Sequence, residues 1–335
     1  MHRVLVIGTG SIGERHVRCL QLTGRAEVGI CEPNRAFRER VAETYNIGEA
    51  FDNLDASLAS QWDSAVVATP APTHIPLARS LVQAGIAPLI EKPLAVETDG
   101  ATELLTDLAA GQLSAGVAYV YRAHPALGAM REAVNAGQFG KPLQMVIVAG
   151  QNFPTYRPAY AQTYYASHAS GGGAVQDALT HLLNAGEWLA GPITTVAADA
   201  AHLRLADVEV EDTVHVLARH GAIMASYCLN QHQAPNECSL TLICEEGTAR
   251  LDLHEHSWRW MDRPDAGWTQ GDCRAMKTRD DWFTAQESAW LDTVEGSVPP
   301  LCSLEEGLQT LRVNRAVLHS IEARQWVDLP QEIEA

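Results

Sequence analysis

Two residues with the chemistry of a proton-transfer pair, Asp177 and His181, lie four residues apart in the stretch SGGGAVQDALTH, residues 170–181. On a helix, positions i and i+4 share a face, so the carboxylate and the imidazole can meet. An unperturbed histidine pKa of about 6.5 suits proton transfer near neutral pH, and a neighbouring carboxylate can orient the ring. Taken alone, the same spacing is also typical of a hydrogen-bonded pair on a helix surface.

A second reactive group, Lys92, follows a short apolar run in APLIEKPL, residues 87–94. Pro93 disfavours the helical conformation at Lys92 and ends the predicted strand there. In open α/β sheets, ligands bind at the carboxyl ends of the strands, so Glu91 and Lys92 are candidates to lie beside a cofactor. The alternative is an ordinary surface Glu-Lys pair next to a turn.

A glycine-rich stretch near the start of the chain has the spacing of a dinucleotide-binding turn. In VLVIGTGSIGERH, residues 4–16, Gly8, Gly10 and Gly13 lie between a predicted strand and a predicted helix that Ser11 and Ile12 open. Gly8 permits a tight turn, Gly10 lets a pyrophosphate approach the backbone, and Gly13 allows close packing of helix and strand. The alternative, that the glycines only shape a turn, is weakened by this strand-turn-helix context.

The end of the second predicted strand carries a carboxylate that bears on the choice of cofactor. Glu32, in ICEP, follows Gly13 by nineteen residues. A carboxylate at this position accepts hydrogen bonds from an adenosine ribose and repels a 2′-phosphate, which favours NAD over NADP. Arg35, three residues further on, weighs the other way because it can pair with such a phosphate.

The third predicted strand ends in VVATPAPTH, residues 66–74, at the same edge of the sheet. We expect Thr69 and Pro70 to line the nicotinamide side of the cofactor. Thr73 and His74 begin the next helix and are assigned to the cofactor side as well. For Thr73 the alternative is a simple helix cap.

Composition bounds the class of protein. The 335 residues suggest two domains, and 24 basic against 41 acidic residues give a formal charge of -17. Such a surface disfavours nucleic acid and anionic membranes as partners. Seven cysteines without a C-x-x-C pair indicate neither a disulfide framework nor a zinc ribbon, which fits a cytoplasmic location. We expect no secretory leader and no membrane span.

Two rhythms of predicted elements divide the chain. Up to residue 122, short apolar runs (3–8, 26–32, 64–70, 87–93, 113–122) alternate with helical segments (11–23, 33–46, 73–85, 97–110), which predicts a doubly wound parallel sheet. After a helix in HPALGAMREAVNAG, strand candidates follow one another (142–150, 193–203, 209–219, 222–233, 236–246, 248–260), which predicts an α+β domain with a mainly antiparallel sheet. We therefore expect domains at 1–120 and 121–335, with late helices at 281–296 and 303–322, the last of which can pack back on the first domain.

The motifs together resemble one family. The glycine turn followed by RH, ATP with a later His, EKP, YR, GGG with the Asp-His pair, and EDT occur in the order found in the Gfo/Idh/MocA oxidoreductases, which include glucose-fructose oxidoreductase and inositol dehydrogenase. The resemblance extends through LICEEGTARLDL, 242–253, to the closing segment 303–330. It implies a Rossmann domain, a second domain with an open sheet, an active site between them and a homodimer or homotetramer.

The resemblance also implies roles for individual residues. In this family the lysine of EKP and the Asp and His of the glycine segment act at the substrate carbinol, and they fall here on Lys92, Asp177 and His181. His181 would accept the hydroxyl proton, Asp177 would orient it, and Lys92 would stabilise the alkoxide. The glycines at 171–173 would let the backbone pass close to substrate or nicotinamide. Asn184 departs from the family, where an Asp is frequent.

Further substrate contacts are expected at Arg122, Arg157 and Tyr164, in segments that should border the site; for the arginines the alternative is a solvated side chain. His254 and His256 in LHEHSWRW lie at strand spacing on one face. Two such ligands do not make a metal site, so no metal is expected.

The sequence therefore predicts an NAD(P)-dependent dehydrogenase or reductase. Hydride would pass between nicotinamide and a secondary alcohol or ketone of a sugar, sugar derivative or inositol. One alternative is an NAD-dependent glycosidase or lyase that uses transient oxidation. Another is a dinucleotide-binding regulator without turnover.

Overall fold

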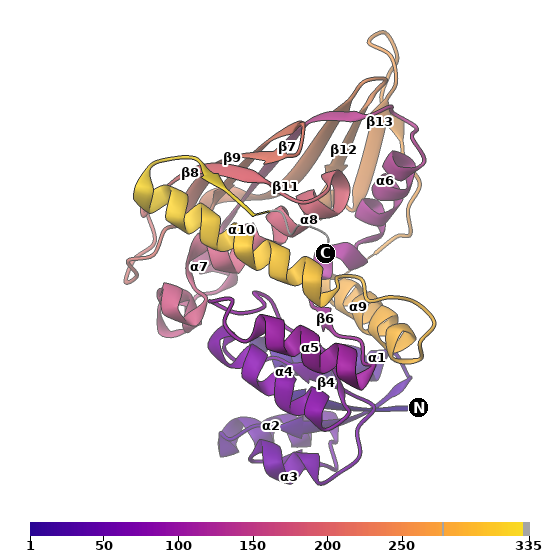
Figure 1. The fold of residues 1–335 in the computed structure, drawn as a ribbon, viewed down its shortest axis with the longest axis vertical. Coiled ribbons are helices and arrows are strands. Elements are labelled where there is room, and N and C mark those ends of the chain that lie inside the picture. The colour runs from indigo at the N-terminus through magenta and orange to yellow at the C-terminus, as the bar shows by residue number, and fades with distance from the viewer. Residues whose placement is uncertain (277, 331–335) are drawn as a thin grey trace. The chain divides into compact units, whose positions relative to one another are not determined.

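A computed structural model describes residues 1–276 and 278–330 (Figure 1). Contacts within the chain define two compact units. The first comprises Met1–Ala123 and Met276–Leu308, and the second comprises His124–Ala275 and the chain from Gln309 onward. Residues 276–308 thus belong to the first unit, which differs from a single division at residue 120.

The first unit contains a six-stranded sheet in the order β3-β2-β1-β4-β5-β6, and each neighbouring pair is parallel. Its strands are β1 (His2–Ile7), β2 (Ala26–Cys31), β3 (Ala50–Phe51), β4 (Ser64–Val67), β5 (Ala87–Ile90) and β6 (Gly116–Val117). The order reverses between β1 and β4, the switch point where ligands bind in such sheets. The phosphate-cradle sequence follows β1, so it lies at that switch point.

Helices supply the apolar cover of this sheet. They are α1 (Ser11–Leu22), α2 (Arg35–Tyr45), α3 (Leu54–Leu58), α4 (His74–Gln83), α5 (Ala101–Gly111) and α9 (Arg279–Val294). Val4 and Val6 of β1 are fully buried, and Trp290 and Leu291 of α9 share their core cluster. This apolar contact explains why α9 belongs to the first unit. The pair β3 and α3 was not predicted.

The second unit is built on a nine-stranded sheet in the order β14-β13-β12-β11-β7-β10-β9-β8-β15. Its strands are β7 (Pro142–Asn152), β8 (Thr195–Ala201), β9 (Thr213–His220), β10 (Ile223–Asn230), β11 (His232–Cys244), β12 (Thr248–Asp252), β13 (Ser257–Met261), β14 (Thr269–Gln270) and β15 (Val327–Asp328). Only β7 and β10 pair in parallel; the other pairs are antiparallel. The predicted fold class is therefore confirmed for both parts.

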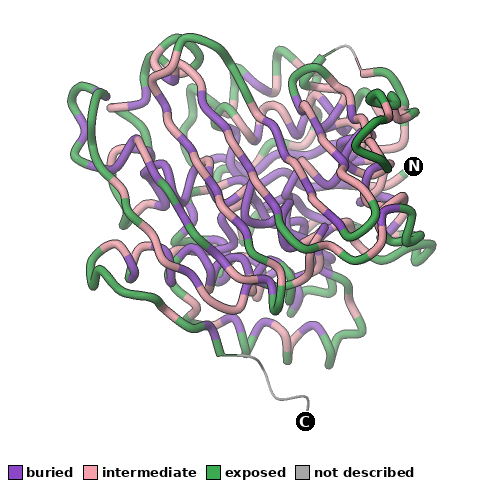
Figure 2. The backbone as a smooth tube through the Cα atoms, turned by 90° about the horizontal axis from the view of Figure 1, so that it is seen from above, coloured by how far each residue is buried: buried purple, intermediate pink, exposed green. Residues whose placement is uncertain are grey.

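Helices gather on one face of this large sheet, where Figure 1 shows α8 and α10. The helices of this part are α6 (Pro125–Asn135), α7 (Phe153–Tyr156), α8 (Thr180–Ala190) and α10 (Leu304–Ala323). The first five residues of α10, 304–308, belong to the first unit. The other face is open: β9 alternates buried and more exposed residues along its length, as the tube in Figure 2 shows for several strands. The alternation fits a sheet with one covered side.

One predicted strand, 248–260, is in fact two. Residues Leu253–Glu255 form a short 3₁₀ turn, and His256 has a left-handed φ of 50°, so the chain reverses between β12 and β13. His254 and His256 consequently do not share a strand face, contrary to the prediction. Among the helices of the described residues, none combines the length and the apolar character of a membrane span.

Candidate functional site

Two glycines of the phosphate-cradle sequence are dictated by packing. Gly8 has a φ of +87°, and a Cβ built on it would lie 2.7 Å from the Ala68 carbonyl oxygen. A Cβ on Gly13 would lie 1.9 Å from the carbonyl oxygen of Gly8. Any side chain at either position would displace the strand-helix turn, so these glycines hold α1 close to β1.

Gly10 has a different environment. It is the exposed N-cap of α1, no side chain caps that helix end, and a Cβ there would meet no atom within 4 Å. Ser11 is exposed beside it and Ile12 is half-buried. Packing therefore does not require a glycine at position 10, and the absence of a side chain leaves open space at this helix end. Backbone N–H groups at a helix N-terminus attract anions, so this corner fits a dinucleotide pyrophosphate.

Glu32 is held in place at the end of β2. Its Oε2 accepts a hydrogen bond from the Thr9 N–H at 2.8 Å, and its Oε1 accepts one from the Asn34 N–H at 2.8 Å. The carboxylate thus ties the glycine turn to the start of α2. Arg35, which weighed toward NADP, is paired with Glu39 at 2.7 Å.

The residues after β4 divide into exposed and buried members. Pro70 and Thr73 are exposed, and Thr69 is half-buried. The Thr73 hydroxyl donates to the Pro70 carbonyl at 2.7 Å and makes no cap of α4, so the capping alternative is wrong. His74 is buried, and its ring nitrogens lie 2.7 Å from the Thr69 carbonyl oxygen and 3.0 Å from that of Pro93. The imidazole therefore contacts the two loop backbones that follow β4 and β5.

Lys92 is half-buried after β5, and the Lys92-Pro93 peptide bond is cis. The backbone N–H of Lys92 donates to Oε2 of the buried Glu91 at 2.9 Å. The other oxygen of Glu91 lies 2.9 Å from Nε2 of His16, a residue of α1. The predicted pair Glu91-Lys92 is therefore connected through the interior to the helix that carries the phosphate cradle.

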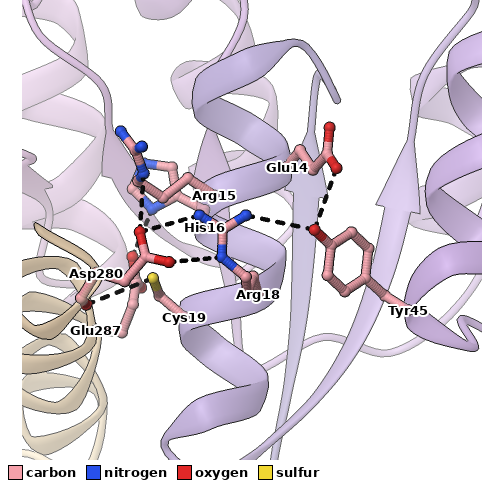
Figure 3. Close-up of polar contacts among 8 residues, drawn as sticks. All are labelled: Glu14, Arg15, His16, Arg18, Cys19, Tyr45, Asp280 and Glu287. Carbon is pink, nitrogen blue, oxygen red and sulfur yellow. Dashed lines mark hydrogen bonds and ion pairs between the residues drawn. The ribbon is translucent and has the colours of Figure 1, made fainter. Parts of the chain in front are cut away.

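Beyond Glu91, the contact network continues into α9. Nδ1 of His16 lies 2.5 Å from Oε1 of Glu287, and Figure 3 shows the His16 side chain between the two helices. Burial disfavours the charged imidazole, but the adjacent carboxylates outweigh burial and raise the pKa of His16 to about 10. Burial likewise opposes ionisation of Glu91, yet the contact with His16 lowers the pKa of that carboxyl. The interior thus holds an imidazolium between two carboxylates.

In the second unit, Asp177 lies in a π-helical turn, Val175–Leu179, and His181 lies in the first turn of α8. The sequence predicted an ordinary helix here. A π turn takes more residues than an α turn, so residue i+4 falls just short of a full turn and the pair stays on neighbouring parts of one face. Asp177 is buried, and its Oδ1 accepts a hydrogen bond from the Tyr164 hydroxyl at 2.6 Å. Two of the predicted site residues are therefore in direct contact.

The three glycines before this helix have a structural reason that differs from the expected one. A Cβ on Gly172 would lie 2.2 Å from the Tyr165 carbonyl oxygen, and one on Gly173 would lie 2.7 Å from Oε1 of Glu211. Gly171 and Gly173 also have positive φ values, 87° and 84°. Gly172 is buried against backbone and Gly173 against the Glu211 carboxylate, and Gly171 has a positive φ, so ligand approach is not needed to explain them.

Glu211 anchors the same segment; from the sequence it appeared only as part of the EDT motif, without a role of its own. Its Oε1 accepts from the Val175 N–H at 2.8 Å, and its Oε2 lies 2.5 Å from Nε2 of His168. The hydrogen bond with Glu211 raises the pKa of His168. Glu211 therefore fixes the start of the turn that carries Asp177.

The three predicted substrate contacts differ in burial and in the partners that the structure gives them. Arg122 is buried, and its Nη1 donates to the Leu301 carbonyl at 2.9 Å and lies 2.7 Å from Oε1 of Glu306. These contacts explain Arg122 without a substrate. Arg157 is half-buried and Tyr164 is exposed. The described residues contain no cluster of three His, Cys, Asp or Glu side chains that would hold a metal.

Comparison with family models decides the classification. Residues 2–119 match the model of an oxidoreductase family with an NAD-binding Rossmann fold, and residues 128–250 match the model of the GFO/IDH/MocA C-terminal domain. The chain belongs to the Gfo/Idh/MocA family. The predicted family and the predicted NAD-binding Rossmann domain are thereby confirmed.

Two inositol 2-dehydrogenases are among the proteins similar in sequence to this Gfo/Idh/MocA chain. Inositol 2-dehydrogenase 4 of Saccharopolyspora erythraea is 28% identical over 200 residues, which are 58% of this chain and 56% of that protein. Inositol 2-dehydrogenase 3 of the same organism is 26% identical over 343 residues, 97% of this chain and 94% of the relative. The matches to the first three curated relatives span between 53% and 60% of their lengths.

Solved structures of similar fold support the architecture. A levoglucosan dehydrogenase in complex with NADH superposes with a TM-score of 0.88 at 19% identity, covering 98% of this chain and 99% of that one. The WlbA dehydrogenase of Bordetella pertussis, in complex with NADH and UDP-GlcNAcA, gives a TM-score of 0.85 at 23% identity, covering 99% and 98%. At these identities the likeness establishes the fold.

Sequence reasoning on this Gfo/Idh/MocA chain missed the partners of its site residues. His16 appeared only as part of the RH motif, and Glu287 was not noticed. Their signal was weak because the two residues lie 271 positions apart in the chain. A helical pattern that turns a histidine toward the buried side of α1 was the one available clue.

Proposed function

We propose that this Gfo/Idh/MocA protein is an NAD(H)-dependent dehydrogenase or reductase acting on a secondary alcohol or ketone of a sugar, sugar derivative or inositol. The observation that carries the proposal is the open corner at Gly10, at the N-terminus of α1 and at the switch point of an NAD-binding Rossmann sheet. Bound there, the nicotinamide nucleotide supplies the hydride acceptor or donor. Side chains of this chain then supply proton transfer, orientation of the base and stabilisation of the alkoxide.

We assign three side chains to the substrate carbinol. In the oxidative direction the carbon-bound hydrogen leaves as hydride while His181 accepts the hydroxyl proton, a role that suits an imidazole near neutral pH. Asp177, whose Oδ1 is fixed by Tyr164, orients the imidazole and stabilises its cation. Lys92 donates a hydrogen bond to the same oxygen and stabilises the developing alkoxide, a contribution of about 2 to 4 kcal/mol for a preorganised donor.

The substrate class is supported by what the relatives are called. They include inositol 2-dehydrogenases and a UDP-N-acetylglucosamine 3-dehydrogenase of Acidithiobacillus ferrooxidans, 31% identical over 42% of this chain. These names share a ring with several secondary hydroxyl groups. We infer a polyhydroxylated ring as substrate, with Arg157 and Tyr164 as further contacts and Arg122 in a structural role.

Glu32 supports NAD over NADP as cofactor. Its carboxylate lies at the end of β2, where a ribose diol would donate hydrogen bonds and a 2′-phosphate would meet negative charge. The two oxygens accept hydrogen bonds from the backbone N–H groups of Thr9 and Asn34, which hold the carboxylate at this position. Arg35, the residue that argued for NADP, has Glu39 as its partner.

We also propose that the protein forms a homodimer or homotetramer and is cytoplasmic. Leu217 and Met224, on the open face of the nine-stranded sheet, are each 55% exposed in the single chain, and apolar side chains on such a face favour association into a homodimer or homotetramer. All seven cysteines are free thiols, which is consistent with a reducing cytoplasm.

The test is a screen of inositols, free sugars and nucleotide sugars with NAD and with NADP, read by nicotinamide absorbance. We expect NADH formation with at least one polyhydroxylated ring and a preference for NAD. Cleavage of a glycosidic substrate without net NADH would instead indicate transient oxidation. Nucleotide binding without turnover of any substrate would indicate a regulator.

A further inference from the structure

We propose that His16 is a positioning residue for the reaction: it holds Glu91, and Glu91 holds the backbone of Lys92, so the helix that presents the phosphate cradle also sets the place of the lysine. This inference rests on the role proposed above for Lys92. It goes beyond that role because His16 and Glu91 are buried and act through the backbone of Lys92.

The geometry forms an unbroken chain of contacts. The Lys92 N–H donates to Oε2 of Glu91 at 2.9 Å, and Oε1 of Glu91 lies 2.9 Å from Nε2 of His16. Nδ1 of His16 lies 2.5 Å from Oε1 of Glu287. Each carboxylate oxygen of Glu91 therefore has one donor, and neither can rotate away without losing a hydrogen bond in the interior.

Burial makes the loss of any of these hydrogen bonds costly in free energy. His16 and Glu287 are fully buried and Glu91 is 4% exposed. Buried polar groups that lose a partner carry the full cost of desolvation, and solvent cannot replace the lost hydrogen bond. Rearrangement of these contacts would therefore cost free energy, and the observed arrangement holds the peptide of Lys92.

The opposite side of Lys92 is held by a second buried histidine. The carbonyl oxygen of Pro93 lies 3.0 Å from Nδ1 of His74, whose Nε2 lies 2.7 Å from the carbonyl oxygen of Thr69. Burial lowers the pKa of His74, which favours the neutral ring. A neutral imidazole carries one N–H and donates to only one of these two carbonyl oxygens, so the Lys92 amide is held by the Glu91 carboxylate, while His74 contacts the backbone that follows it.

Helix docking alone does not explain the network. Arg18 already binds Asp280 of α9, with Nε to Oδ2 at 2.7 Å, and Arg15 contacts the same carboxylate at 3.1 Å (Figure 3). Phe283 of α9 packs edge-on against the His16 ring with centroids 5.8 Å apart. Replacing a whole buried ion pair by well-packed apolar residues is often neutral for stability, so the packing of α1 on α9 does not by itself require Glu91 and His16. A positioning role does.

The experiment compares His16→Gln and Glu91→Gln with Arg18→Gln as the matched control. Arg18 lies on the same helix pair but does not contact Glu91. The first readout needs no turnover: amide hydrogen exchange at Lys92 in the full-length protein. We expect the exchange to accelerate about 10-fold or more in His16→Gln and to stay as in the parent in Arg18→Gln, because only His16 holds the acceptor.

The second readout is steady-state kinetics on the substrate found in the screen. We expect His16→Gln to lower kcat about 10- to 100-fold, as small misplacements of a reacting group do, with KM for the polyol and Kd for NADH changed less than threefold. Glu91→Gln should retain more activity than Glu91→Ala, since its amide oxygen can still accept from the Lys92 N–H. Arg18→Gln should lower stability while kcat is kept.

Unchanged Lys92 exchange in a folded His16→Gln variant would overturn the inference, as would an equal loss of kcat in Arg18→Gln. If His16→Gln does not fold, the comparison of Glu91→Gln with Glu91→Ala decides the matter by the same two readouts. Failure of the proposed function looks different: the parent would turn over no substrate, while the exchange at Lys92 would still respond to His16.

Discussion

The hydroxyl of Tyr164 donates a hydrogen bond to Oδ1 of Asp177 at 2.6 Å, joining a short 3₁₀ segment, Tyr164–Ala166, to the π-helical turn before α8. Asp177 is buried and Tyr164 is exposed, so the phenol connects the carboxylate to the surface of the second unit. This contact joins two residues predicted from the sequence within the second unit.

Tyr164→Phe removes this hydrogen bond and keeps the ring. A hydrogen bond to a charged group is worth about 1.5 to 3 kcal/mol, so we expect kcat/KM for the sugar substrate to fall about 10-fold or more. NADH affinity, measured by fluorescence titration, should be unchanged because Tyr164 belongs to the second unit. Wild-type kcat/KM in Tyr164→Phe would show that the phenol does not serve Asp177.

The glycine segment predicts a loss of stability that needs no ligand. In Gly172→Ala the new Cβ would lie 2.2 Å from the Tyr165 carbonyl oxygen, a clash that we expect to lower the free energy of unfolding by about 2 to 4 kcal/mol. Gly128→Ala in α6 is the control, because its Cβ meets no atom within 4 Å and it should stabilise the protein by up to about 1 kcal/mol. Denaturant unfolding measures both. Equal stability of the two variants would refute the packing account.

Two glycines of the phosphate cradle should separate binding from folding. Gly10→Ala places a methyl group in open space, so we expect the free energy of unfolding to stay as in the parent. The affinity for NADH should fall about 10-fold or more, because the methyl group would meet the pyrophosphate. Gly13→Ala forces a Cβ to within 1.9 Å of the Gly8 carbonyl oxygen and should lower the melting temperature. Fluorescence titration and thermal unfolding test the pair. Undiminished NADH affinity in Gly10→Ala would contradict the assignment of this corner to the pyrophosphate.

Protonation of His16 predicts how stability depends on pH. Its folded-state pKa of about 10 lies above the unfolded value of 6.5. The stabilisation is therefore complete below pH 6.5 and is lost as the pH rises toward 10, with a slope of at most about 1.4 kcal/mol per pH unit for one proton. Denaturant unfolding of the parent at pH 7, 8 and 9 should show this decline.

The His16→Gln variant is the reference for that experiment. Buried cysteines with raised pKa values, such as Cys19 and Cys244 at about 11 each, also destabilise the fold in alkali, and the variant retains them. The difference between the two proteins between pH 7 and pH 9 isolates the histidine. A parallel decline in both proteins would mean that His16 is neutral in the folded state.

The first unit was largely predictable because strands covered on both faces must be apolar throughout, and glycines mark the one turn that cannot bear side chains. The placement of α9 was not, since its partner α1 lies more than 250 residues away in the chain and no local pattern records that contact. The resulting pairing of His16 with Glu287 was equally hidden. Long-range polar contacts leave no periodicity to read.

In the second unit, the sequence indicated most of the strands and a mainly antiparallel sheet, but it did not give the order of the strands in the sheet and misjudged local geometry. The π turn that holds Asp177 has the same apolar spacing as an α-helix, so the pattern does not distinguish them. The strand at 248–260 is broken because His256 adopts a left-handed conformation, which residue type alone did not reveal. The sequence predicted that substrate or nicotinamide constrains the glycines at 171–173, but the constraint on Gly172 comes from Tyr165 and that on Gly173 from Glu211.

The most direct test of the central claim is the rate of hydride transfer in Lys92→Met and His181→Gln at saturating NAD and substrate, beside NADH affinity for each variant. Our account predicts a fall in kcat of about 100-fold or more in both variants, with NADH binding within about threefold of the parent. Parental turnover in either variant would contradict the assignment of proton transfer and alkoxide stabilisation to these two side chains.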